Sequence, residues 1–366
     1  MPAAASLPPG TERRKGSGQS LPALRSPLVR YLSTVYVRDH GAKVGHRRGS
    51  LLVTQDSRAT RIPLEAIDGV VLLGSGQVTS EAIAACVKRG IRIASLRRNG
   101  AVRFVVGGPM SGNVHLRMAQ HAAVLSTDHS LRISRAIVAA KLQSSRRMLL
   151  RWSRDAPNAR SRQRLSQRAD MIADRISRVA NSGSGDHVRG IEGDGARIYF
   201  RGMAQHLDDV GMRFGTRTRR PPRDPVNALL SFGYGLLTTE IEGAINAIGL
   251  DHQLGFLHRP RSGRPSLALD LAEELRPLAD RFAVSMLKRR QLGPEHFVST
   301  PGGGVYLSDE GREAVVKFWE AHKETRVPHR VLRRPVDRWA LPTVQATLLA
   351  RHLRGDLAEY PPFVLA

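Results

Sequence analysis

Four side chains in the second half of the sequence are of the types that bind a divalent cation: Glu192, His258, Asp270 and Glu273. Carboxylates with one imidazole and no thiolate suit Mg²⁺ or Mn²⁺. In phosphodiester chemistry such an ion polarises the phosphoryl oxygen, lowers the pKa of an attacking hydroxyl and stabilises the leaving oxygen. The four residues are far apart along the chain, so their spacing alone does not show that they share one site.

Each candidate also has a purely structural interpretation. Glu192 has glycine neighbours that would allow a close approach, but an acid in the first turn of a helix is also favoured by the helix dipole. A lone histidine such as His258 is more often structural than a ligand. Asp270 and Glu273 share a face of an apolar helix, where acids are costly unless bound to a cation or paired, for example with Arg276.

The charge balance favours a polyanionic partner. The chain has 366 residues, with 57 Lys and Arg against 32 Asp and Glu and a net charge of +25. Arginine binds phosphate with two parallel hydrogen bonds and stacks on bases, so this excess indicates nucleic acid. A GC-rich genome would explain arginine in place of lysine, but not the excess of base over acid. An anionic membrane surface is less favoured, because no basic amphipathic helix has an aromatic face.

The candidate DNA contacts are arginines that flank the acidic stretches. They are Arg217, Arg219, Arg220, Arg223, Arg259, Arg261 and Arg264. The first four precede a long predicted helix and are equally compatible with an ordinary solvated loop. A further arginine-rich stretch, 146–168, falls on two adjacent predicted helices and also favours contact with DNA.

Other classes of protein are excluded or unsupported. Hydrophobic residues make up 41% of the chain, too many for a disordered protein. No uncharged apolar run approaches the ~18 residues of a transmembrane helix, and the N-terminus lacks the apolar core of a signal peptide. The single Cys86 excludes a disulfide framework and a cysteine-based zinc site. Motifs for ATP hydrolysis or dinucleotide binding are missing. We therefore expect a cytoplasmic protein.

The elements that position these residues change type near residue 112. Before it the pattern is β, with predicted strands at 31–37, 50–55, 61–64, 67–73, 91–96 and 102–106 and one helix that Ser80 caps and Gly90 ends. After it the pattern is helical, at 113–126, 130–152, 163–180, 225–248, 277–290 and 341–354. The expected fold is α+β and multidomain. It comprises a disordered basic tail (1–27), a β-sandwich or β-roll domain (28–110) and a larger all-α catalytic domain (111–366).

Seven stretches resemble the CRISPR-associated endonuclease and integrase family Cas1, which inserts new spacers into CRISPR arrays. They are RIPLEAIDGVVLLG (61–74), GNVHLRMAQ (112–120), RGIEGDGARIYF (189–200), DPVNALLSFGYGLL (224–237), GLDHQLGFLH (249–258), GRPSLALDLAEELRP (263–277) and RGDLAEYPPF (354–363). The last of these, together with RRPPRDPVNALLSF, resembles the type I-C branch most closely.

The resemblance implies roles for particular residues and partners. Glu192, His258 and Glu273 fall on the metal ligands of the family, and Asp270 matches a further acid of the same site. An N-terminal β-sandwich and a C-terminal helical catalytic domain are implied, with homodimers that form through the β domains. Such dimers would flank a dimer of the small ferredoxin-like protein Cas2, and a type I-C setting adds the nuclease Cas4.

The resulting hypothesis is a metal-dependent DNA integrase. A prespacer 3′-hydroxyl would attack a phosphodiester at the repeat boundary by direct transesterification, without ATP. The alternatives are a metal-dependent nuclease on branched or single-stranded DNA, and a non-catalytic architectural DNA-binding protein.

Overall fold

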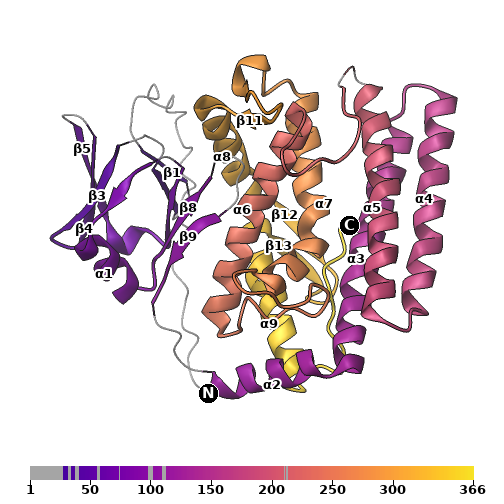
Figure 1. Ribbon diagram of the computed structural model, residues 1–366, viewed down its shortest axis with the longest axis horizontal. Coiled ribbons are helices and arrows are strands. Elements are labelled where there is room, and N and C mark those ends of the chain that lie inside the picture. The colour runs from indigo at the N-terminus through magenta and orange to yellow at the C-terminus, as the bar shows by residue number, and fades with distance from the viewer. Residues whose placement is uncertain are drawn as a thin grey trace, which may run out of the picture.

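The computed structural model describes residues 28–31, 34–37, 41–55, 58–73, 75–97, 102–108, 113–209, 211 and 213–366. The predicted basic tail lies outside these residues. Figure 1 shows the strands of the N-terminal part gathered on one side and a larger helical part beside them. The α+β prediction is confirmed.

The N-terminal part contains two sheets and one helix. The five-stranded sheet has the order β1 (Leu28–Tyr31), β2 (Thr34–Val37), β6 (Gly69–Leu72), β8 (Arg92–Leu96) and β9 (Val102–Val106). The four-stranded sheet has the order β5 (Arg58–Pro63), β4 (Ser50–Gln55), β3 (Lys43–Arg47) and β7 (Gln77–Val78). Helix α1 (Ser80–Lys88) is capped by the Thr79 side chain rather than by Ser80.

The middle strands of the five-stranded sheet contribute side chains to two hydrophobic cores. Val70 and Leu72 point into a core shared with the four-stranded sheet and α1. Val71 packs against the core of the helical part, and the hydroxyl of Tyr36 donates to Glu320 Oε1 of that part at 2.5 Å. This sheet therefore connects the two parts of the molecule.

The C-terminal part is mostly helical. Its helices are α2 (Val114–Leu125), α3 (Thr127–Arg154), α4 (Ala159–Ala180), α5 (Gly185–Asp208), α6 (Pro225–Ile248), α7 (Ser266–Lys288), α8 (Asp309–Lys323) and α9 (Leu341–Leu353). Helix α3 packs against α4, α5 and α7, and α6 packs against α7 and α9 (Figure 1). Short 3-10 helices also occupy Pro294–His296 and Arg338–Ala340, and another, Leu64–Ala66, lies between β5 and β6 of the N-terminal part.

The helical part differs from the prediction in three ways. Two small antiparallel hairpins interrupt it, β10 (Phe297–Ser299) with β11 (Val305–Leu307) and β12 (Arg326–His329) with β13 (Arg334–Asp337). Helices α5 and α8 did not appear among the predicted helices, because glycines and charged residues obscure their periodicity. The helix predicted at 277–290 is longer in the structure: α7 begins at Ser266 and continues through Pro277. The prediction began it at Pro277 because proline is common in the first turn of a helix.

Candidate metal centre and DNA groove

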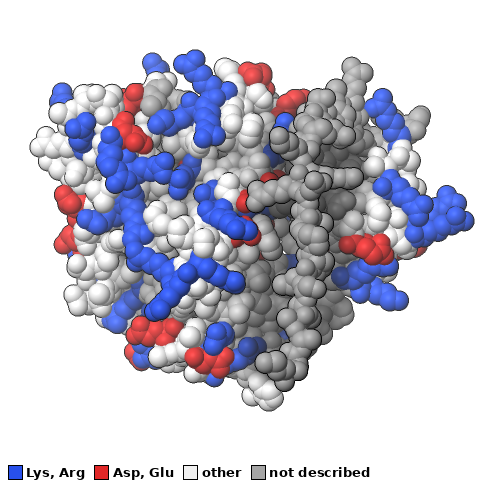
Figure 2. All heavy atoms as spheres, turned by 180° about the vertical axis from the view of Figure 1, so that it is seen from behind, with Lys and Arg blue, Asp and Glu red and all other residues white. Residues whose placement is uncertain are grey.

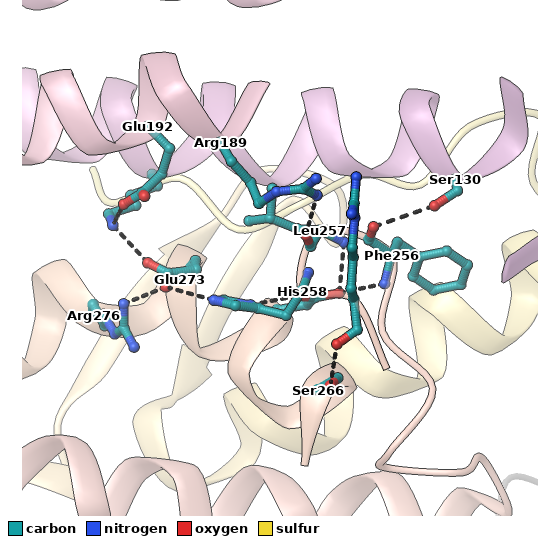
Figure 3. A network of polar contacts seen from close by, with 12 residues as sticks. Ser130, Arg189, Glu192, Phe256, Leu257, His258, Ser266, Glu273 and Arg276 are labelled. Atoms are coloured by element: carbon teal, nitrogen blue, oxygen red, sulfur yellow. Dashed lines mark hydrogen bonds and ion pairs between the residues drawn. The ribbon is translucent and has the colours of Figure 1, made fainter. Parts of the chain in front are cut away.

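Three of the predicted ligands lie close together, two of them paired with a buried lysine. The Lys141 ammonium on α3 forms ion pairs with Glu192 Oε1 on α5 and, at 2.6 Å, with Glu273 Oε2 on α7. His258 Nε2, from the loop before α7, is 3.9 Å from Glu273 Oε1 (Figure 3). Residues remote in the sequence thus form one cluster at the junction of three helices.

Glycines on α5 allow that helix to approach α3 closely. A Cβ on Gly195 would overlap the Leu142 side chain, and a Cβ on Gly202 would overlap Leu149. The two glycines are seven residues apart, so they lie on the same face of α5. Their spacing explains how Glu192 comes within ion-pair distance of Lys141.

Asp270 positions the loop that carries His258. Its carboxylate accepts the backbone N–H groups of Phe256, Leu257 and His258 at 2.6, 3.0 and 2.9 Å, and it is fully buried. A Cβ on Gly255 would lie 2.8 Å from Asp270 Oδ2, so this turn requires glycine.

Asp270 also sets the tautomer of the imidazole. His258 Nδ1 lies 2.7 Å from Asp270 Oδ1. Because an ionised carboxylate can only accept, the proton is on Nδ1 and the lone pair of Nε2 is available on the side of Glu273. The Asp270 oxygens are directed at this loop rather than at Lys141, so Asp270 orients a potential ligand.

The buried charges at the cluster compensate one another. Burial by itself would lower the pKa of Lys141, but Glu192 and Glu273 outweigh it and raise that pKa. Burial would likewise raise the pKa of Glu273, but Arg276, Lys141 and His258 outweigh it and lower that pKa. The Arg276 guanidinium pairs with Glu273 Oε1, as the structural interpretation of these acids predicted. Lys141 and Glu273 are therefore charged together at neutral pH.

Sequence reasoning missed Lys141. Its flanking residues Ile137, Val138 and Leu142 are buried, so it lies on an inward face of α3, where a lysine needs a carboxylate partner. It is also one of seven lysines in a chain with 50 arginines. Those two observations together would have singled it out.

The donor set fits a hard divalent cation, although its present arrangement does not enclose one. Within the described part of the chain, no three His, Cys, Asp or Glu side chains are close enough to hold a metal ion. The physical reason is that the Lys141 ammonium lies between Glu192 and Glu273 and provides the positive charge there. Two carboxylates and an imidazole with a free Nε2 are nonetheless the ligand types that Mg²⁺ or Mn²⁺ takes.

A large cationic groove reaches this cluster. It has a volume of about 1530 Å³ and lies between β8, β9 and α6, with His258 and Arg276 in its wall. Five of the predicted DNA-contacting arginines line it, namely Arg217, Arg219, Arg220, Arg261 and Arg264. Arg92 and Arg103 of the β part line it too. In Figure 2 Lys and Arg side chains form a band across the face seen from behind, with Asp and Glu mainly at its margins.

One carboxylate also lines the groove. Burial raises the pKa of Glu242 to about 7, with Arg92 acting in the opposite direction. At neutral pH Glu242 is therefore only partly ionised and subtracts little from the positive potential of the groove.

The other two predicted arginines lie outside the groove lining. Arg259 Nη2 pairs with Asp186 Oδ2 at 2.6 Å, and Arg223 Nη1 donates to the carbonyl oxygen of Gly302 at 3.2 Å. Contact of these two arginines with DNA stays a prediction.

Tyr234 of α6 packs against the core of the helical part and also forms part of the groove wall. Its hydroxyl donates to Asp280 Oδ1 at 2.5 Å. The guanidinium carbons of Arg276 and Arg217 lie 5.1 and 5.4 Å from the ring centroid, within cation–π range. This ring thus links the Glu273 partner Arg276 to the arginine loop before α6.

The fold and the cluster together define an α+β protein with a buried carboxylate–imidazole site beside a cationic groove. The chain belongs to the Cas1 family, since the family model described as CRISPR associated protein Cas1 matches residues 35–321. A relative from Rhodospirillum rubrum, the CRISPR-associated endonuclease Cas1 2, is 40% identical over 92% of this chain and 99% of its own length. The prediction of an enzyme of the endonuclease class is confirmed. The comparisons identify the family and do not distinguish the type I-C branch.

Solved structures share the fold. A casposase bound to integration product superposes with a TM-score of 0.77 at 23% identity, covering 90% of this chain and 93% of that chain. A Cas1 protein from Thermotoga maritima gives 0.76 at 24% identity, covering 91% and 99%. In the part of the chain that the structure describes, no helix is long and apolar enough to cross a membrane.

Proposed function

We propose that this chain is the integrase of CRISPR adaptation, which joins prespacer DNA to the CRISPR array. One observation carries the proposal: Glu192 and Glu273 share a buried ammonium, and His258 lies beside Glu273 in the wall of an arginine-lined groove. Such a site combines the ligands for a divalent cation with a surface for the phosphate backbone.

Glu192, His258 and Glu273 would hold Mg²⁺ or Mn²⁺. The bound ion would supply Lewis-acid polarisation of the phosphoryl oxygen and a lowered pKa of the attacking hydroxyl. Asp270 keeps His258 Nε2 available by accepting from Nδ1. Lys141 balances the two carboxylates before the cation binds and must give up at least one of its ion pairs when the cation arrives.

The reaction is a direct transesterification. The prespacer 3′-oxygen forms a new bond to the phosphorus at the repeat boundary and gives its proton to water. The bond to the leaving 3′-oxygen of the array breaks, and that oxygen takes up a proton from water. One phosphodiester replaces another, so no ATP is needed. The groove arginines Arg219, Arg220, Arg261 and Arg264 hold the DNA backbone through charge-assisted hydrogen bonds.

The same proposal includes the partners. Homodimers form through the β part (28–110), the helical part (111–366) is catalytic, and a Cas2 dimer joins the two Cas1 dimers in the cytoplasm. The sequence features of the type I-C branch add Cas4. A relative from Geobacter sulfurreducens, named a Cas4 exonuclease/Cas1 endonuclease fusion, is 33% identical over 90% of this chain, which supports that partner.

A strand-joining assay tests the proposal. The chain and its Cas2 partner are incubated with a labelled duplex bearing free 3′-hydroxyls, a supercoiled repeat plasmid and Mn²⁺. Label joined to the plasmid at the repeat boundary supports the integrase. Cleavage without joining would indicate the nuclease alternative, and metal-independent DNA binding without any product would indicate an architectural protein.

Asp270→Asn is expected to weaken Mn²⁺ binding about 10- to 100-fold, the usual effect of losing the group that orients a histidine ligand. The amide offers only one acceptor oxygen to the four donors that now converge on the carboxylate. Calorimetric titration with Mn²⁺ measures the change. Asp251→Asn is the matched control, because Asp251 Oδ1 accepts the backbone N–H of Gln253 and no imidazole. Equal affinities of the two variants would contradict the role of Asp270.

A further inference from the structure

A second arginine-lined pocket lies away from the groove. Arg147, Arg151 and Arg154 line it from α3, Arg281 lines it from α7, and the segment Leu365–Ala366 closes one side. Its volume is about 260 Å³. The three α3 arginines are spaced i, i+4, i+7, so they form one stripe along the helix. The pocket and the groove have no lining residue in common.

This pocket lacks compensating negative side chains. No Asp or Glu lines it, and across the described ranges none of its four arginines forms an ion pair with a carboxylate. Arg147 instead donates to the carbonyl oxygen of Leu365. Other half-buried arginines of this chain do have acidic partners, as Arg175 has in Asp194 at 2.8 Å.

The electrostatic environment of the pocket is repulsive for cations. Burial, and then Arg151, lower the pKa of the half-buried Arg281. Burial, and then Arg330 and Arg146, lower the pKa of Arg147. Cations held together in this way raise the free energy of the folded protein, and an anion in the pocket would offset that cost.

The surface beside the pocket is also basic. Arg154 ends α3, and the start of α4 carries the exposed Arg160, Arg162 and Arg164. The two segments are joined by a hydrogen bond of 2.9 Å from Ser153 Oγ to the carbonyl oxygen of Arg162. An extended polyanion seated in the pocket would therefore continue onto further cations.

We propose that the pocket formed by Arg147, Arg151, Arg154 and Arg281 binds a backbone phosphate of DNA at a place apart from the groove. Guanidinium groups match phosphate with paired hydrogen bonds, and the volume admits a phosphate group rather than a whole duplex. Arg151 is ten residues beyond Lys141 on α3, about 15 Å along the helix axis, so the two sites are separate. The inference rests on the proposed function, because it assumes that this chain handles DNA.

Salt-dependent DNA binding tests the pocket. The full-length double variant R151Q/R281Q is compared with R326Q/R351Q, which removes two exposed arginines that are paired with Asp337 and Asp356. Affinity for a labelled duplex is measured by fluorescence anisotropy in EDTA over a range of salt concentrations. We expect the slope of log affinity against log salt to fall by about 1 to 2 in R151Q/R281Q, since each lost phosphate contact removes about 0.9. The control variant should keep the wild-type slope.

The outcomes separate the possible sources of the phosphate. An unchanged slope in a folded R151Q/R281Q, with its melting temperature within a degree or so of the control, overturns the inference. In a second arm, inorganic phosphate is titrated against the DNA-free protein in thermal melts. Stabilisation of wild type but not of R151Q/R281Q, together with an unchanged DNA slope, would assign the pocket to a free anion and overturn the DNA assignment. Failure of wild type itself to bind or join DNA would count against the proposed function instead.

Discussion

Replacing Glu192 by Ala is expected to reduce strand joining by about 1,000-fold or more, since a catalytic divalent cation supplies several kcal/mol of transition-state stabilisation. The variant loses one of the two carboxylates that face Lys141. The fraction of labelled duplex joined to the repeat plasmid in Mn²⁺ measures the loss. DNA binding in EDTA should change little, because the groove arginines remain.

The matched control is Asp194→Ala, two residues further along the same helix. Asp194 pairs with Arg175 and Arg197 on the outer side of α5 and does not contact Lys141. Joining by this variant should stay within a few-fold of wild type. Full activity of Glu192→Ala, or equal losses in both variants, would show that the cluster is not the reaction centre.

Lys141→Met is expected to destabilise the metal-free protein by about 3 kcal/mol or more, the usual cost of removing one partner from a buried ion pair. The side chain of Lys141 is 9% exposed and that of Glu273 is 3% exposed, so water cannot replace the ammonium. Thermal or denaturant unfolding in EDTA measures the loss. Lys288→Met, at the exposed end of α7, is the control and should unfold like wild type.

Mn²⁺ should reverse this effect. In wild type the cation must displace at least one ion pair of Lys141, whereas in Lys141→Met it meets two carboxylates without a counter-ion. The rise in melting temperature on adding Mn²⁺ should therefore be larger in Lys141→Met than in wild type. An equal or smaller rise would show that lysine and cation do not occupy the same place.

Local patterns in the sequence predicted much of the β part. Strands at 50–55 and 102–106 were predicted with the bounds of β4 and β9, because their apolar residues end at turn-forming residues. The predicted strand at 67–73 contains β6, whose Val70 and Leu72 are buried. The predicted strand at 31–37 contains the last residue of β1 and the whole of β2, two strands that pair antiparallel with each other.

The helical part was harder to predict where tertiary contacts override composition. Five glycines between 185 and 202 lower the helix propensity of α5, yet two of them are needed for its close packing on α3. Pro277 lacks the N–H that would bond to the carbonyl of Glu273, but α7 continues because its apolar face is buried against α3 and α6.

The sequence predicted which residues could form the candidate site, but not how they are arranged in space. Glu192, His258 and Glu273 were identified because they lie in stretches that resemble the family. Lys141 lies in none of these stretches, and only the fold brings it between the two carboxylates. Similarly, Arg259 and Arg223 are in arginine-rich loops like the groove residues, but their side chains turn to Asp186 and to a carbonyl group. Which way a loop side chain points depends on contacts that spacing does not encode.

Crystals of the chain grown or soaked with Mn²⁺, with anomalous diffraction collected near the manganese edge, examine the central assignment directly. We expect a single strong peak within about 2.0–2.3 Å of Glu192, His258 and Glu273, with the Lys141 ammonium moved out from between the carboxylates. Lys141 still bridging Glu192 and Glu273, with manganese bound elsewhere or nowhere on the chain, would contradict the account.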